Sequence, residues 1–372
     1  MEEGLENFVP LIKRSRGYEE LKKDVIDSGI CSGCGACAAF CDRVGLTEDG
    51  SVPASDCNMT MGAVKCNIDG ICYDCCPHVS YSVGGLEDVV FGARREDGLL
   101  GQYLKAFAVR SKDKEVLKKA QDGGAATSLL LAAVNEGFSD AAVVTGRDNS
   151  WNVDSSASSD KKEIVGGAGT KYARAPGILK LGENLRKIPR LAIVGTGCQI
   201  AGTRRLEKKL LSAVPKAELT LIGLFCYENF PYTRLKEIIE DRLGLKMEDV
   251  TKTDITKGKL FVWTKDGKTH EKPVKEFADL APESCEICRD FTATFSDITC
   301  GSIGSDDGWT TVIVRSQRGM DLLNAAKEKD YIEVSDKVNL EAVKRTGGFK
   351  GKKRAKVLSE REKEGKFVPD YS

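Results

Sequence analysis

The sequence predicts an α/β body with a mainly parallel or mixed sheet, preceded by a small cysteine-rich domain of the α+β type. Two observations support this division. Residues 28–95 hold nine of the 14 cysteines but few apolar runs, so this segment cannot bury an ordinary core. From about residue 100, short apolar runs alternate with amphipathic stretches, which indicates strands alternating with helices.

Four regions are expected along the 372 residues: a helical lead of mixed charge (1–27), the cysteine-rich domain (28–95), the body (96–343) and a basic tail (344–372). The basic stretch 344–366 is expected to be a solvated helix or tail. The predicted strands are 106–110, 141–145, 191–195, 219–226, 260–264 and 310–314. The predicted helices are 124–136, 176–185, 199–211, 231–243 and 319–327.

Composition narrows the classes of function. The formal net charge is zero, which gives no general case for binding nucleic acid. The first residues lack the pattern of a signal peptide, and no apolar run reaches the ~18 residues of a membrane span, so a cytoplasmic protein is expected. In such a chain, clustered cysteines are metal ligands rather than disulfides. The two histidines, His78 and His270, argue against histidine-rich zinc sites and Ser–His or Cys–His nucleophiles.

The first cysteine group has the spacing C-x2-C-x2-C-x3-C. It comprises Cys31, Cys34, Cys37 and Cys41. Two-residue gaps wrap a tight loop around one 4Fe–4S cluster, and in two-cluster ferredoxins the fourth cysteine of such a run binds the other cluster. The segment is therefore interpreted as a ferredoxin-like iron–sulfur domain.

The second group reads C-x2-D-x2-C-x3-C-P from Cys66 to Pro77, with Asp69 where a cysteine is expected. Swapped ligation assigns one cluster to Cys31, Cys34, Cys37 and Cys76, and a second to Cys41, Cys66, Cys72 and one further ligand. Three alternatives remain open for that position: Asp69 ligates through oxygen, Cys57 or Cys75 replaces it, or the cluster has only three irons.

Four cysteines of the body stand in distinctive places. Cys198 and Cys226 each follow a predicted strand, and Cys285 and Cys288 form a C-x2-C pair. Strand ends lie at the ligand-binding edge of an α/β sheet, where the C-x2-C loop could close over them and complete a third cluster. Plain packing of buried thiols is the alternative.

Residues from Ala106 onward resemble the β subunit of coenzyme F420-reducing hydrogenase, a body shared by the F420 dehydrogenase input subunits. The matching segments are 120–127, 168–172, 195–199, 226–232, 256–264, 285–288 and 297–311. The cysteine-rich segment is not part of the hydrogenase subunit, but it is found in the dehydrogenase input subunit and in deazaflavin-dependent sulfite reductase.

The resemblance implies FAD, a coenzyme F420 site and a cluster held by Cys198, Cys226, Cys285 and Cys288. Two residues depart from the family pattern. Gly197 replaces a usual proline, so a looser loop is expected there. Cys300 occupies a position that is commonly small or apolar, and it is interpreted as a packed thiol.

The predicted FAD and coenzyme F420 contacts lie in three segments. The first opens a helix, whose free N–H groups favour a pyrophosphate, although a plain helix start is the alternative. In the second, a lysine could neutralise a phosphate and a tyrosine could stack on a ring or simply pack. The third is a glycine-rich turn with a tryptophan that walls the pocket or packs in the core. These residues are Gln121, Gly123, Gly124 and Thr127; Thr170, Lys171 and Tyr172; and Gly301, Ser302, Gly304 and Trp309.

The expected reaction is hydride transfer between reduced coenzyme F420 and FAD, without an acid–base residue, followed by single-electron transfer through 4Fe–4S clusters. The expected partner is an electron-accepting or electron-donating protein subunit or a ferredoxin, with docking on a membrane or hydrogenase complex left open. The alternatives are a subunit of an F420-reducing hydrogenase or heterodisulfide-reductase-type complex running in reverse, a reductase of another substrate, and a non-catalytic relay.

Overall fold

The computed structural model describes residues 16–39, 41, 44–47, 53–55, 70–95, 97–213 and 217–372, without the side chains of 53–55 and 208–213. The expected α/β body is confirmed. Its main sheet, within these residues, has eight strands in the order β13-β3-β12-β11-β7-β6-β4-β5. The strands are β3 (Lys105–Ser111), β4 (Ala141–Arg147), β5 (Val153–Ser158), β6 (Arg190–Thr196), β7 (Glu218–Leu224), β11 (Ile298–Gly301), β12 (Thr310–Val314) and β13 (Ile332–Ser335).

The sheet is mixed. Strands β4, β6, β7 and β11 run parallel, while β5, β12, β3 and β13 pair antiparallel on either side of them. The carboxyl ends of the four parallel strands therefore meet at one edge, which is where an open α/β sheet binds its ligands.

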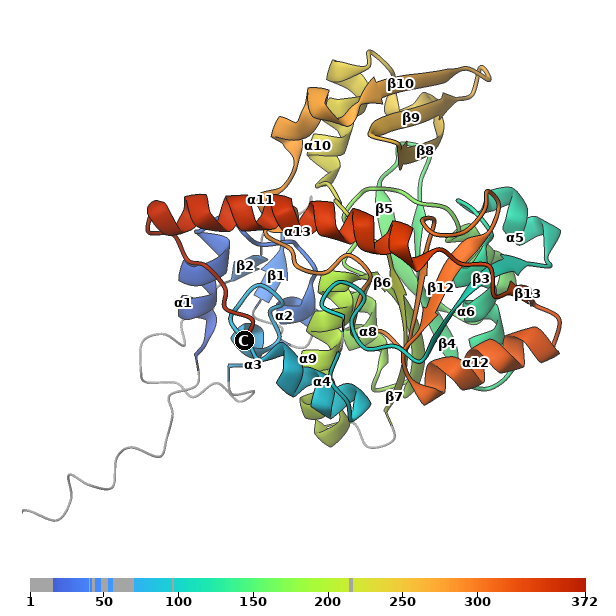
Figure 1. Ribbon diagram of the computed structural model, residues 1–372, viewed down its shortest axis with the longest axis horizontal. Coiled ribbons are helices and arrows are strands. Elements are labelled where there is room, and N and C mark those ends of the chain that lie inside the picture. Colours follow the sequence, from blue (N-terminus) through green and yellow to red (C-terminus); the bar gives the residue numbers. More distant parts are fainter. Residues whose placement is uncertain are drawn as a thin grey trace, which may run out of the picture.

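Helices cover both faces of the main sheet (Figure 1). One face packs against α6, α7 and α12, and the other packs against α8, α9 and the cysteine-rich segment. Successive residues of β4 enter opposite cores: Ala141 and Val143 one, Ala142 and Val144 the other. The helices of the body are α5 (Lys114–Lys119), α6 (Ala125–Asn135), α7 (Lys161–Gly166), α8 (Ile178–Asn184), α9 (Gly197–Ala213), α10 (Tyr232–Glu237), α11 (Glu283–Glu286), α12 (Gln317–Glu328) and α13 (Leu340–Lys363).

A second, antiparallel sheet stands above the ligand-binding edge (Figure 1). It consists of β8 (Val250–Thr256), β9 (Lys259–Thr264) and β10 (Thr269–Pro273). Its core, which includes Phe230, Ile238 and Val262, is separate from the cores of the main sheet. Short helical turns at Ile238–Arg242, Met247–Asp249 and Val274–Leu280 flank this sheet.

The cysteine-rich segment packs directly on the body. Its described elements are α1 (Tyr18–Leu21), a π-helical turn (Lys22–Ile26), α2 (Ala36–Ala39), β1 (Val44–Leu46), β2 (Pro53–Ser55), α3 (Ile71–Asp74) and α4 (Val83–Phe91). Leu21, Val25 and Ile30 share one apolar core with Ile178 of α8 and Ile200 of α9. The segment therefore gains from the body the buried apolar surface that its own sequence lacks.

The basic C-terminal stretch forms the helix α13, which crosses the front of the molecule (Figure 1). The expectation that the whole stretch is solvated is wrong for Lys350 and Arg361, which are 4% and 2% exposed. Each of these buried cations donates to backbone carbonyls, which compensates part of its lost hydration. Residues after the helix contact the cysteine-rich segment, where the Tyr371 hydroxyl donates to the Pro77 carbonyl at 3.0 Å.

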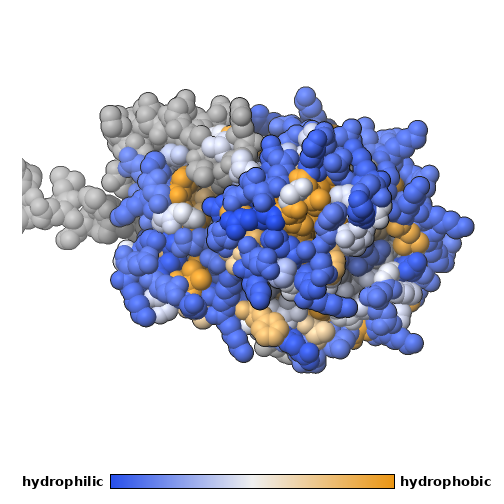
Figure 2. Space-filling model, turned by 90° about the horizontal axis from the view of Figure 1, so that it is seen from above, coloured by the Kyte–Doolittle hydropathy of each residue, from blue (hydrophilic) through white to orange (hydrophobic). Residues whose placement is uncertain are grey.

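The surface offers no broad apolar face in the view from above, where small apolar patches lie among hydrophilic side chains (Figure 2). Across the described ranges, every helix is too short or too polar to cross a bilayer.

Candidate cluster and cofactor site

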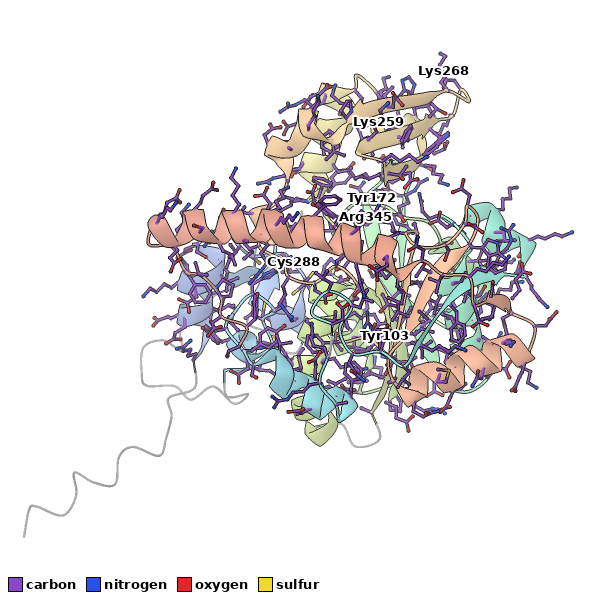
Figure 3. All side chains as sticks on the ribbon, viewed as in Figure 1. Tyr103, Tyr172, Lys259, Lys268, Cys288 and Arg345 are labelled. Atoms are coloured by element: carbon purple, nitrogen blue, oxygen red, sulfur yellow. The ribbon has the colours of Figure 1, made fainter. Side chains whose placement is uncertain are left out.

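The four body cysteines line one cavity at the carboxyl edge of the main sheet. Cys198 lies in the first turn of α9, directly after β6, and Cys226 follows β7. Cys285 belongs to α11, and Cys288 follows two residues after that helix ends. The ends of two strands and the segment 285–288 thus bring four cysteines to the lining of one cavity, which is the set that the family resemblance implies. Figure 3 shows Cys288 beneath α13.

Local contacts hold the loop before Cys198, and the expectation that it is looser than a proline-containing loop stays a prediction. Gly197 is the first residue of α9, and the Thr196 N–H donates to Gln199 Oε1 at 3.0 Å. A Cβ at position 197 would lie 2.8 Å from the Asp290 carboxylate. A larger residue at position 197 would therefore require the Asp290 side chain to shift.

A second cavity gathers the predicted ligands of the first ferredoxin-type cluster. Cys31, Cys34, Cys37 and Cys76 all line it, together with the apolar side chains of Leu21, Val25 and Ile26. The Gly33 N–H donates to the Cys31 sulfur at 3.4 Å. The swapped assignment, in which Cys76 joins the first three cysteines, is thus the grouping that the fold brings together.

The second ferredoxin-type group is only partly described. Cys66 and Asp69 lie outside the described residues, as does Cys57, so their part in a cluster stays a prediction. Cys72 is buried in the shared core and Cys41 is packed against it. Cys75 is fully buried, and its thiol donates to the Cys72 carbonyl at 3.6 Å.

The two cavities share a wall. Ser32, Gly33, Cys34 and His78 line both of them. Burial raises the pKa of the Cys34 and Cys198 thiols to about 11, and the nearby Ser32 hydroxyl offsets only a small part of that rise. The Ser32 hydroxyl itself forms no hydrogen bond of normal geometry among the described atoms. The shared wall therefore brings one predicted cluster site beside the other.

Unpaired polar atoms indicate that these cavities are built for a polar group. Ser32 Oγ, both nitrogens of His78 and Asn229 Oδ1 are buried without a partner among the described atoms, and all three residues line the body cavity. Burial lowers the pKa of His78 to about 3, with help from Arg174 and Lys350, so this imidazole is neutral. Such atoms cost free energy unless a bound group satisfies them. Cluster sulfurs accept hydrogen bonds, so they suit the Ser32 hydroxyl and the one N–H of neutral His78, whereas Asn229 Oδ1 is itself an acceptor and needs a donor.

Charge in the cavity also suits an anionic metal cluster. Burial raises the pKa of Cys198 and of Cys285 to about 11, so both are thiols until a metal displaces the proton. Two cationic side chains, Arg174 and Lys350, line the same cavity. In the described part of the chain no three Cys, His, Asp or Glu side chains converge as they would around a single ion. A cubane cluster is larger than an ion and spreads its ligands farther apart.

The predicted FAD contacts meet where the small sheet joins the main sheet. The side-chain oxygen of Gln121 accepts from the Thr170 N–H at 3.5 Å, and its backbone oxygen accepts from Lys252 Nζ at 3.3 Å. Asp122 accepts a hydrogen bond from the Ser302 hydroxyl. Segments that are distant in the sequence therefore form one junction.

The start of α6 is well placed for an anion. Gly124, with φ of 75°, is its N-cap and no side chain caps the helix, so the first N–H groups stay free. Thr127 is buried in that first turn. However, a Cβ at Gly123 would lie 2.5 Å from the Val109 carbonyl oxygen and 2.7 Å from the Thr310 nitrogen. Packing of α6 on β3 and β12 thus already requires Gly123.

Lys171 and Tyr172 are tied into local structure. Lys171 Nζ donates to three carbonyls of its own loop, at residues 167–169, and burial lowers its pKa to about 8. The Tyr172 hydroxyl accepts from the Ile255 N–H at 2.9 Å and lies 3.4 Å from Asp254 Oδ1. Tyr172 thereby joins the loop to β8, at the base of the small sheet in Figure 3.

The glycines of the glycine-rich turn pack in two different places, one against Phe225 and the other against the start of α13. The Phe225 ring lies on Gly301, where a Cβ would be only 1.9 Å from its nearest ring atom. Gly304 packs on the start of α13, near Asn339 and Val343. Trp309 is half-buried, and its backbone N–H donates to the Asp306 carbonyl. Ser302 joins the junction through Asp122, and the backbone of Trp309 packs on Gly123, where a Cβ would lie 2.9 Å from the Trp309 carbonyl carbon. Cys300 is buried in the core, as predicted.

Sequence reasoning missed several residues of the site. Ser32, His78 and Asn229 adjoin predicted ligands, and their short distance in sequence from a cysteine was the available signal. Lys350 gave no local signal, because it lies in a basic helix whose exposed and buried lysines look alike in sequence.

Comparisons with known proteins cover most of the chain. Residues 188–339 match the family model for the C terminus of the coenzyme F420 hydrogenase/dehydrogenase beta subunit, and residues 106–181 match the model for its N-terminal part. The beta subunit of coenzyme F420 hydrogenase from Methanosarcina barkeri is 35% identical over 72% of this chain and 94% of its own length.

Another relative extends into the cysteine-rich segment. The F subunit of F(420)H(2) dehydrogenase from Methanosarcina mazei is 30% identical over 92% of this chain and 96% of its own. Among solved structures, a chain of the F420-reducing [NiFe] hydrogenase complex from Methanosarcina barkeri superposes with a TM-score of 0.70 at 33% identity. That match covers 74% of this chain and 98% of the other.

Proposed function

Because the chain belongs to the family of coenzyme F420 hydrogenase/dehydrogenase beta subunits, we propose that it is the F420-oxidising or F420-reducing component of an oxidoreductase. It exchanges a hydride between coenzyme F420 and FAD and passes single electrons through 4Fe–4S clusters to a partner protein or a ferredoxin. FAD supplies the chemistry that joins two-electron to one-electron transfer.

One observation carries the proposal. Two cysteine-lined cavities share a wall, and the body cavity opens at the same sheet edge as the junction of the two sheets. A protein that moves electrons between a flavin and a chain of clusters needs this order of sites. A zinc or disulfide site would not need a second cavity beside the first.

Cluster binding is assigned to three sets of residues. Cys198, Cys226, Cys285 and Cys288 hold the body cluster, and Cys31, Cys34, Cys37 and Cys76 hold the adjoining ferredoxin-type cluster. A third cluster is assigned to Cys41, Cys66 and Cys72 with Asp69, Cys57 or Cys75, or in a three-iron form. The first two sets are supported by the cavities that they line.

Binding of FAD is assigned to the junction and the start of α6. The free N–H groups after Gly124 bind the pyrophosphate, and Thr127 lies on the same turn. Lys171 acts on the phosphates through its charge, because its three donors already hold loop carbonyls. Gln121, Thr170, Tyr172 and Ser302 are assigned to FAD or coenzyme F420 at the junction of the two sheets, with Gly301 and Trp309 beside them at the ends of β11 and β12.

Hydride transfer needs no proton donor from this chain. The protein positions two rings and excludes water from them. Cys34 lines both cavities and Cys198 lines the body cavity, so we assign the path of electrons between the two clusters to the wall that holds Cys34. We place the protein in the cytoplasm, where the partner receives or supplies the electrons.

The test is an anaerobic turnover experiment. Purified protein loaded with FAD and iron is mixed with reduced coenzyme F420 and a viologen dye, and the return of the deazaflavin absorbance is followed. We expect absorbance to return, faster with added FAD, and the Cys226→Ala variant to lose transfer to the dye. Full flavin and iron content without any oxidation of reduced coenzyme F420 would contradict the proposal.

A further inference from the structure

Lys350 is a buried cation at the wall of the body cavity. It lies on α13, after residue 339 where the family match ends, and it is 4% exposed. Its Nζ donates to the Cys226 carbonyl at 2.8 Å and to the Asp290 carbonyl at 3.1 Å. It therefore contacts one cysteine-bearing loop and the residue two positions after Cys288.

The charge of Lys350 lacks a carboxylate at ion-pair distance within the described residues. An ammonium buried among apolar and backbone groups is costly unless negative charge lies near it. The cavity that Lys350 lines is the place for that charge.

A cubane held by four thiolates is anionic, and one-electron reduction makes it more so. A fixed positive charge nearby stabilises the more negative state, and low polarity strengthens the effect. One-electron reduction of the cluster adds only an electron, so the effect of the nearby charge involves no proton and no second reactant.

Resting on the function proposed above, we propose that Lys350 sets the reduction potential of the cluster held by Cys198, Cys226, Cys285 and Cys288. Its ammonium shifts one-electron reduction of that cluster toward the reduced form. Lys350 does not bind the cluster; it acts on the reduction potential through its charge.

Lys353 provides a matched control on the same helix. Its Nζ pairs with Glu228 at 3.1 Å and with Glu286 at 3.2 Å, and its side chain is 33% exposed. It bridges the same two cysteine-bearing loops, but two carboxylates balance its charge. Lys353 does not line the cavity and solvent screens its partly exposed charge, so removing it perturbs the same region with a smaller electrostatic effect on the cluster.

The experiment is a redox titration of the iron-loaded, full-length protein followed by electron paramagnetic resonance. The signal of the body cluster is the one that Cys226→Ala removes. We expect Lys350→Met to lower the equilibrium constant for its one-electron reduction about tenfold, which is a shift of about 59 mV to lower potential. Lys350→Arg should keep most of the wild-type value, and Lys353→Met should change the constant less than about threefold.

Several outcomes would overturn the proposal. One is a Lys350→Met potential equal to that of Lys353→Met with full iron content. If Lys350→Met loses iron, Lys350→Gln, which can still donate to the carbonyls, carries the test. Loss of iron in both variants would assign Lys350 a purely structural role. The redox titration does not use coenzyme F420, so the effect of Lys350 on the potential could still be determined if the turnover test of the proposed function failed. A wild-type protein without any signal sensitive to Cys226→Ala would instead refute the cluster assignment.

Discussion

Replacing Gly182 with alanine should loosen the contact between the cysteine-rich segment and the body. Gly182 lies inside α8, where the backbone of α2 rests on it. An added Cβ would be 1.7 Å from the Ala39 carbonyl oxygen, whereas real Cβ contacts essentially never fall below 3.0 Å. The helix α2, which carries Cys37, must therefore move by about 1.3 Å, the difference between these two distances.

Gly182→Ala should stabilise the protein if helix propensity dominates and destabilise it if packing against α2 dominates. Glycine to alanine inside a helix normally stabilises by up to ~1 kcal/mol. Forcing a backbone atom away from a packed surface costs about 1–3 kcal/mol or more, and a carbonyl cannot rotate aside as a side chain can. We expect the packing cost to prevail, with docking of α2 weakened by about 1–2 kcal/mol.

Hydrogen exchange measures this directly. The amides of Ala38 and Ala39 donate to the Gly35 carbonyl at 3.1 and 2.9 Å, and their exchange should accelerate by about 5–30-fold. Gly348 of α13 is the control, because a Cβ there meets nothing within 4 Å, and Gly348→Ala should leave α2 unchanged. If Gly182→Ala left the α2 amides at their wild-type rates, the reasoning from this contact would be refuted.

Three further predictions concern buried polar groups. Burial lowers the pKa of Lys171 from 10.5 to about 8, so between pH 8 and pH 10.5 the unfolded chain binds more protons than the folded chain. The free energy of unfolding should therefore rise with pH in this range. Lys171→Met should flatten that rise, as measured by urea titrations at several pH values. Arg361→Met should destabilise the protein by about 3 kcal/mol in the same assay, since it leaves the Ser28 and Phe367 carbonyls without their donor. Cys300→Ala should keep the wild-type iron content while Cys198→Ala loses about one cluster in a colorimetric assay; equal losses would refute the distinction between packed and ligating thiols.

Apolar runs made much of the body predictable. All six predicted strands are present as β3, β4, β6, β7, β9 and β12, and the five predicted helices are found with shifted ends. The strands that were missed lack such runs. Strand β5 reads Val153–Ser158 and is mostly polar because it pairs only with β4, at the margin of the sheet. Edge strands with one partner need less apolar surface, so their pattern is weak.

The candidate site was predictable where spacing carries the chemistry. Cysteine spacing indicated the set in the cysteine-rich segment, whereas the set of four body cysteines followed from the family resemblance together with two predicted strand ends and one C-x2-C pair. The other residues of the site are brought together by long-range contacts, which leave no local pattern in the sequence. The Gly-Gly pair before α6 could be explained by a phosphate, yet packing against Val109 and Thr310 also requires Gly123. A lysine such as Lys350 is recognised only when the helix that bears it is placed over the cysteines.

Residues 370–372 contact a segment that the ribosome makes much earlier, so these contacts form late in folding. The Asp370 N–H donates to Ser80 Oγ at 2.9 Å, across 290 positions, and the Tyr81 and Val83 amides donate to the carbonyls of Asp370 and Ser372. A ribosome therefore makes Ser80, Tyr81 and Val83 long before residues 370–372, which contact them. These contacts can form only after the whole body between them has been synthesised.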